Sequence, residues 1–182
     1  MKKSILCFLA VMLLTAAAGE AAQLSLIPKL GIAAPLGNHH VDMKSSYYIS
    51  ATGLYKYQRE YYLEASVGYM PVNPTDDWNE LWENIADYSG SLITLLAGAR
   101  KYSPGGDLYI EGGGGLYLYS VNFHDESLGA TDLSESFTGG YGAAGYIPEE
   151  NIEINGTFHW PNFDAFLFNL NVGYKFDLSG LR

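Results

Sequence analysis

The chain has 182 residues, with 20 acidic and 10 basic side chains and a formal net charge of −10. This balance excludes nucleic acid as a main partner, because phosphate backbones require a basic surface. The length fits one domain. Its 15 tyrosines and 21 glycines are typical of a membrane barrel, in which tyrosine lies at the lipid boundary and glycine occupies crowded or bent strands.

Residues 1–22 have the pattern of a secretory signal peptide. Lysines at positions 2 and 3 precede an apolar run at 5–14, and small residues follow, with cleavage after Ala18 or near Ala21. A transmembrane helix is the alternative, but the run is short for a hydrocarbon core of ~30 Å. We therefore expect an exported mature domain at 23–182. The single cysteine, Cys7, lies in the signal, so no disulfide is expected in the mature chain.

Eight segments of alternating apolar and polar residues follow the signal. The first four are expected at about residues 24–34, 46–57, 61–69 and 93–99, and the next two at about 108–119 and 137–147. The last two form the hairpin from Ile152 to Phe176, whose large apolar side chains fall on even numbers. Such alternation predicts β-strands with one apolar and one polar face. Most segments match the ~9 to 11 residues that cross a membrane at a tilt.

The connections between these segments alternate in length. Those at 36–45, 71–90 and 121–136 are long, whereas those at 58–59, 103–106 and 148–150 are short. The last outer connection, at 161–164, is also short and is the exception to the alternation. Outer-membrane barrels have short periplasmic turns and longer extracellular loops. The sequence therefore predicts an all-β fold, an eight-stranded antiparallel up-and-down transmembrane β-barrel. The alternative is a soluble sandwich or a soluble periplasmic ligand-binding barrel, whose apolar face would point inward.

Two stretches carry a resemblance to a known family. Leu95 to Tyr117, with its turn Ser103-Pro104-Gly105-Gly106, resembles the central hairpin of the small outer-membrane barrels of Gram-negative bacteria, the OmpA/OmpX/OmpW-like porin-family group. Tyr141 to Pro148 and the final hairpin are similar to the same group. The resemblance implies a barrel in outer-membrane lipid, inserted by the barrel-assembly machinery that reads a terminal aromatic residue. Phe176 fits that signal, but residues 177–182 follow it.

An inward-facing polar set follows from the alternation. Arg or Lys facing lipid at the midplane costs ~2 to 4 kcal/mol, so we expect charged side chains in the lumen. The expected lumen network is Glu64, Arg100, Glu111, Glu153 and Lys175, with Lys29, Lys56, Asn155, Asn169 and Asn171 facing the same way. Eight strands leave just enough room for side chains to fill the interior. We therefore expect a filled lumen with a structural role and minor passage of solutes at most, with a gated polar path as the alternative.

The connection at 71–90 contains a possible interaction patch. Trp78, Leu81, Trp82 and Ile85 fall at helical spacing among acidic residues, which predicts a short amphipathic helix on the outer rim. Exposed aromatic side chains often mark interaction sites, so Trp78 and Trp82 are candidates for ligand docking. The alternative is that they pack on the barrel mouth or among lipid headgroups.

Metal binding and catalysis find little support in the sequence. His39, His40 and Asp42 include two imidazole groups, but adjacent residues rarely present both to one ion, so we expect no metal and no cofactor. Some barrels of this size are lipid A deacylases with a His-x-Ser arrangement, which makes His159 the candidate for an outer-membrane lipid-modifying enzyme. The run His159-Trp160-Pro161 has no serine at that place. We therefore expect a monomeric, non-enzymatic surface barrel of structural or interaction type.

Overall fold

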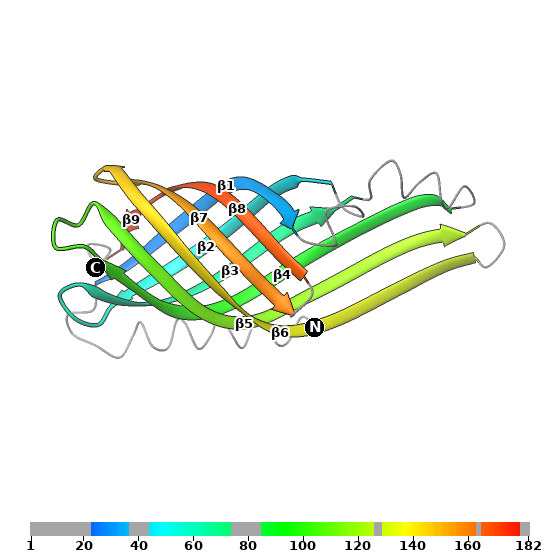
Figure 1. The fold of residues 1–182 in the computed structure, drawn as a ribbon, viewed down its shortest axis with the longest axis horizontal. Coiled ribbons are helices and arrows are strands. Elements are labelled where there is room, and N and C mark those ends of the chain that lie inside the picture. Colours follow the sequence, from blue (N-terminus) through cyan, green and yellow to red (C-terminus); the bar gives the residue numbers. More distant parts are fainter. Residues whose placement is uncertain (1–22, 37–43, 74–84, 126–128, 163–164, 179–182) are drawn as a thin grey trace.

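The structure is a computed structural model that describes residues 23–36, 44–73, 85–125, 129–162 and 165–178. These residues form one antiparallel sheet that closes into a barrel, because β1 pairs with both β2 and β8 (Figure 1). The strands are β1 (Leu24–Leu36), β2 (Ser46–Lys56), β3 (Tyr61–Val72), β4 (Ile85–Tyr102), β5 (Leu108–Asp125), β6 (Gly129–Glu149), β7 (Ile152–Asn162), β8 (Ala165–Tyr174) and β9 (Phe176–Asp177). Among the described residues, no helix is long and apolar enough to cross a membrane.

The short strand β9 continues β8 along the same edge of β1. Lys29 lies opposite Gly173 of β8, and Leu26 lies opposite Phe176 of β9, so the barrel has eight positions around its axis. The N–H of Leu178 also donates to the carbonyl of Leu24, at 2.9 Å. The first two residues after Phe176 therefore still belong to the barrel wall.

Strands β4, β5 and β6 are longer than the sequence pattern indicated. They span 18, 18 and 21 residues. The strands β1, β2, β3, β7 and β8 are shorter, with 10 to 13 residues each. The expected long loop at 121–136 is wrong, because β5 and β6 stay paired as far as Asp125 and Gly129. The outward face of β5 turns from apolar to polar at Ser120 and Asn122, whereas Val121 stays buried inside. The outward apolar pattern that marks the other strands therefore ends although the ladder continues.

The helix predicted in the connection at 71–90 does not extend to Ile85, so this part of the prediction is wrong. Ile85 begins β4, and Asp87 lies opposite His124 of β5. Trp78, Leu81 and Trp82 lie outside the described residues, as do His39, His40 and Asp42.

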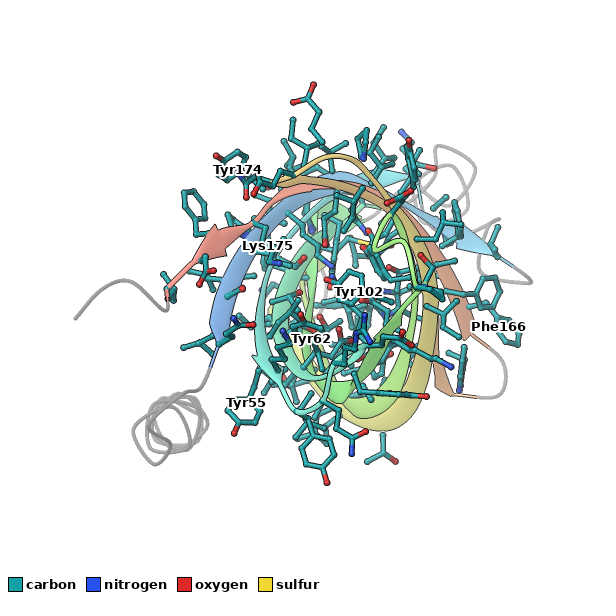
Figure 2. The ribbon with its side chains drawn as sticks, turned by 90° about the vertical axis from the view of Figure 1, so that its left-hand side faces the viewer. Tyr55, Tyr62, Tyr102, Phe166, Tyr174 and Lys175 are labelled. Atoms are coloured by element: carbon teal, nitrogen blue, oxygen red, sulfur yellow. The ribbon has the colours of Figure 1, made fainter. Side chains whose placement is uncertain are left out.

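The barrel wall is apolar outside, and its interior holds buried polar and charged residues beside an apolar cluster that includes Met70 and Leu96. Leu30, Ile32 and Ile110 are 61%, 65% and 63% exposed, whereas Arg100 is fully buried in the interior. Figure 2 looks into the barrel from the end with the short turns, and shows Tyr55 and Tyr174 outside the ring of strands and Tyr102 within it. The residue polarity is thus reversed relative to a water-soluble barrel.

Candidate functional site

Arg100 is the centre of a buried ionic cluster in the lumen. Its strand position places it opposite Glu111, next to the tight turn that joins β4 and β5. Its Nε donates to Glu111 at 2.8 Å and its Nη1 to Glu153 at 2.7 Å, and Nε lies 3.5 Å from a Glu64 oxygen. One guanidinium therefore contacts carboxylates from three strands, β3, β5 and β7. The planar fork of arginine, with five N–H donors, suits this arrangement.

Lys29 of β1 completes the cluster. Its Nζ lies 3.0 Å from Glu153 and 4.0 Å from Glu111. The two cations and three carboxylates have a formal charge of −1, and the Tyr141 hydroxyl donates a hydrogen bond to Glu64. Each of these ions is paired, as a charge removed from water requires. The cluster joins the walls contributed by β1, β3, β4, β5 and β7 across the barrel axis.

A ladder of side-chain amides extends the cluster along the wall. Asn155 donates to Glu111 at 3.3 Å, and Asn171 donates to the amide oxygen of Asn155 at 3.1 Å. Both asparagines are almost fully buried. Asn155 thus uses both its amide nitrogen and its amide oxygen, and its hydrogen bonds link β7 to β5 and β8 inside the lumen.

Tyrosine rings close the lumen on the turn side of the cluster. The Arg100 guanidinium lies 4.0 Å from the centre of the Tyr109 ring, and its Nη1 donates to the Tyr102 hydroxyl at 3.2 Å. Tyr102 also packs against Tyr109 and Tyr62, with ring centres 5.6 and 5.1 Å apart. Figure 2 shows Tyr62 and Tyr102 together inside the mouth of the barrel.

His159 lies on the loop side of the cluster. It is 2% exposed and is surrounded by the rings of Tyr48, Tyr117 and Tyr141. Its Nδ1 is 3.2 Å from the Tyr117 hydroxyl and its Nε2 is 3.0 Å from the Asn169 amide nitrogen. Both ring nitrogens are therefore engaged with neutral groups inside the lumen, and no serine is among the partners that the structure describes for this ring.

The space left between these layers is small. A cavity of about 20 Å³ is bordered by Glu64, Glu111, Tyr141 and His159, among others. That volume has room for about one water molecule. A wider recess of about 470 Å³ opens among the turns, where Lys175 and Glu150 line it.

The fold is shared with barrels of known structure. Neither a protein-family model nor a curated protein matches the sequence. Ail, the attachment invasion locus protein of Yersinia pestis, solved with the heparin analogue sucrose octasulfate, has 13% identity and a TM-score of 0.61 over 87% of this chain and 100% of that one. A major outer membrane protein from Thermus thermophilus has 13% identity and a TM-score of 0.59, over 86% and 100%. Neisserial surface protein A has 12% identity and a TM-score of 0.55, over 86% and 98%.

This chain has the fold of the small outer-membrane β-barrels. The predicted eight-stranded antiparallel barrel is confirmed, and the resemblance seen in the sequence is confirmed at the level of the fold. The likeness covers nearly the whole of each neighbour, so the barrel here corresponds to a complete barrel in those proteins.

Within this barrel, four of the five expected lumen residues meet in one cluster. They are Glu64, Arg100, Glu111 and Glu153, whereas Lys175 lines the recess at the turn end. Lys56 also lies at the turn end, where it donates to Gln23 at 2.9 Å. Lys175 occupies the break between β8 and β9, where the strict alternation of faces stops.

Tyr141 is the cluster residue that the sequence pattern did not reveal. It belongs to the glycine-rich segment at 137–147, whose weak alternation gave no reliable face. A side chain on Gly98 of β4 would collide with the Tyr141 hydroxyl, so glycine there leaves room for the hydrogen bond to Glu64. The one feature of the sequence that could have indicated its inward position is that Tyr141 is a large residue among glycines and alanines. Among the described residues, no group of three or more histidine, cysteine or acidic side chains is placed so that it could hold a metal ion.

Proposed function

We propose that the chain is an outer-membrane protein of structural or surface-interaction type, with its loop end outside the cell. The observation that supports this most strongly is the belt of exposed apolar side chains around a lumen that holds buried ions. Soluble monomers rarely expose contiguous apolar patches above a few hundred Å². Lipid accepts such a belt, and a closed barrel leaves no strand edge within it. This polarity disfavours the soluble ligand-binding barrel.

We also propose that the lumen is filled and passes small solutes at most in a minor way. The ionic cluster spans the interior between opposite walls, tyrosine rings pack beneath it, and the cavity above has room for about one water molecule. Breaking the Arg100 pairs to open a path would leave buried charges unpaired, which is costly. Structural reinforcement is therefore the favoured role for Glu64, Arg100, Glu111 and Glu153.

The filled lumen predicts a negative result in conductance measurements. Purified protein in planar bilayers is expected to give no long-lived open current, whereas a general-diffusion porin in the same bilayer conducts. Liposome-swelling assays with small sugars are expected to agree. Sustained conductance of porin size would contradict the filled lumen, although it would leave membrane insertion intact.

The proposal also covers export, assembly and the absence of catalysis. Residues 1–22 direct export, 23–182 form the mature domain, and the barrel inserts as a monomer through the barrel-assembly machinery. Catalysis on lipid is disfavoured because His159 is buried in the lumen with both nitrogens engaged. A sulfated glycan like the ligand solved with Ail fits this chain poorly, since its loop end is strongly acidic.

A further inference from the structure

The hydrogen bonds around His159 define where its ring carries a proton. The Tyr117 hydroxyl donates to the carbonyl of Gly140 at 2.8 Å, so its oxygen is left to accept from Nδ1 of His159 at 3.2 Å. The amide nitrogen of Asn169 can only donate, so Nε2 of His159 accepts from it at 3.0 Å. This network assigns a neutral imidazole whose single proton is on Nδ1.

Asn169 of β8 has an acceptor that this arrangement does not use. The residue is 2% exposed, and within the described part of the chain its Oδ1 has no hydrogen-bond partner. A buried polar atom without a partner costs free energy. A half-turn of the side-chain amide exchanges its oxygen and nitrogen, which are similar in size, and would bring Oδ1 to Nε2 of His159. The two side chains therefore have a second hydrogen-bonded arrangement, provided that Nε2 carries a proton.

The lumen beside His159 has an excess of negative charge. The ring borders the cavity of about 20 Å³ together with Lys29, Glu64 and Glu111. The charged residues of the ionic cluster on the surrounding strands are Lys29 on β1, Glu64 on β3, Arg100 on β4, Glu111 on β5 and Glu153 on β7 itself. Their formal charge is −1, so one imidazolium would bring the cluster and the ring together to zero. A buried charge is tolerated where an opposite charge lies nearby.

Neutral rings and amides form the rest of the surroundings of His159. Those that contact the ring or share its cavity, from β2, β5, β6 and β8, are Tyr48, Tyr117, Tyr141, Asn169 and Asn171. Tyr141 is stacked on the imidazole, with ring centres 6.2 Å apart and 29° between the planes. The face of an aromatic ring attracts a cation at about this distance. A protonated His159 would therefore have a favourable contact on its face as well as at Nε2.

We propose that His159 and Asn169 form a proton-operated switch in the lumen. At neutral pH the ring is neutral and accepts from the Asn169 amide. On acidification Nε2 takes up a proton, the amide makes a half-turn, and Nε2–H donates to Oδ1, while the contact between Nδ1 and Tyr117 is unchanged. The barrel thereby takes up one positive charge beside the ionic cluster without leaving a ring N–H unpaired, and stays folded in acidic surroundings. The switch needs only the closed barrel, so it is independent of the surface role proposed above.

Nitrogen NMR of the whole mature protein in nanodiscs observes the proton directly. The ring signals of His159 are identified by their loss in His159→Gln. The pH is lowered from about 8 to about 4, a range that includes the usual charge change of histidine. At the upper end we expect a proton on Nδ1 and none on Nε2. As the pH falls, Nε2 is expected to gain a proton, and the side-chain amide signals of Asn169 are expected to shift with the same pH dependence.

Asn169→Asp is expected to hold the pair in its acid arrangement. The carboxylate has nearly the shape of the amide but can only accept, so the same NMR measurement is expected to show an imidazolium at neutral pH. The matched control is Asn171→Asp, which adds the same charge on the same strand beside the same cavity, although the hydrogen bond described for Asn171 is with Asn155. That variant is expected to leave the ring neutral. Equal proton uptake in both variants would overturn the role of Asn169.

Asn169→Leu tests the switch through stability. Leucine is similar in size but has no acceptor for Nε2–H, so the folded variant binds the proton less readily than the parent protein. Between about pH 7 and about pH 4, the ratio of folded to unfolded protein in vesicles is expected to fall roughly threefold or more beyond the fall in the parent protein, since a hydrogen bond to a charged group is lost. In the His159→Gln background, which forms no imidazolium, the same substitution is expected to add no pH-dependent loss.

Four results would overturn the switch. A proton on Nε2 at about pH 8 would make the second arrangement the resting one. A ring that stays neutral in the folded barrel at about pH 4 would show that it takes up no proton. Protonation without a change in the Asn169 amide signals would separate the proton from the amide. Equal acid sensitivity of the parent protein and Asn169→Leu would show that the amide oxygen does not hold the imidazolium.

Discussion

Replacing Arg100 by methionine is expected to lower the free energy of unfolding by about 3–5 kcal/mol, the usual cost of removing one partner from a buried ion pair. Arg100 is fully buried and contacts Glu64, Glu111 and Glu153. Methionine keeps an unbranched apolar stem but is shorter and has no charge, so it leaves the carboxylates without their main counter-ion. The measurement is urea unfolding of refolded protein in lipid vesicles, followed by the fraction of the folded band on gels.

A matched variant separates this effect from the loss of any cation. Lys56→Met removes a cation whose partner is an exposed amide, that of Gln23, and is expected to change stability by less than about 0.5 kcal/mol. Adding Glu64→Gln to Arg100→Met is expected to restore part of the loss, because the ion pair described for Glu64 is with Arg100, whereas Glu153 keeps Lys29. An Arg100→Met protein as stable as the Lys56→Met protein would show that the cluster does not stabilise the barrel.

Leu30→Arg is expected to destabilise the folded barrel by about 2–4 kcal/mol if its face meets lipid. Leu30 lies midway along β1, is 61% exposed and is flanked by Ile49 and Val172, which are also exposed. On a protein surface in water the same exchange usually changes stability by no more than about 0.5 kcal/mol. The substitution therefore distinguishes lipid from water as the surroundings of this face.

Tyr57→Arg is the control for position along the membrane normal. Tyr57 is 65% exposed, about as much as Leu30, but it lies at the turn end of the barrel, next to the last residue of β2. Near the membrane surface the cost of an arginine on the outer face of a barrel falls to about 0–1 kcal/mol. Both variants are measured in the same vesicles by urea unfolding. Equal, small effects at Leu30 and Tyr57 would place water around the belt.

The parts of the barrel that the sequence predicted are those in which lipid and lumen impose opposite polarity. In β7 and β8 apolar and polar residues alternate with few exceptions, such as the buried Leu167, so the strands follow from alternation. The side on which the apolar face lies was inferred from the lengths of the connections and from the cost of charges in lipid. The outer parts of β5 and β6 gave no such signal because their outward face turns polar, at residues such as Ser120 and Ser134. Residues 121–136 are therefore predicted as a loop from the sequence. The outward extension of β5 and β6 was therefore missed.

For the lumen, the sequence predicts which residues face inward but not which of them pair with one another. The facing of Glu64 and Arg100 follows from their parity within a strand, and the tight turn places Arg100 opposite Glu111. Contacts of Arg100 with Glu153, or of Lys29 with Glu153, depend on how strands that are not direct neighbours are staggered. Residue spacing along one chain carries no direct record of that stagger, so the partners could not be assigned beforehand.

The claim that the apolar belt faces lipid is tested most directly by cell fractionation combined with gel mobility. The protein is expected to remain with outer membranes after a carbonate wash, and to migrate differently on a denaturing gel before and after boiling, because a folded barrel resists the detergent at room temperature. Recovery in the periplasmic supernatant, with the same mobility in heated and unheated samples, would contradict the membrane barrel.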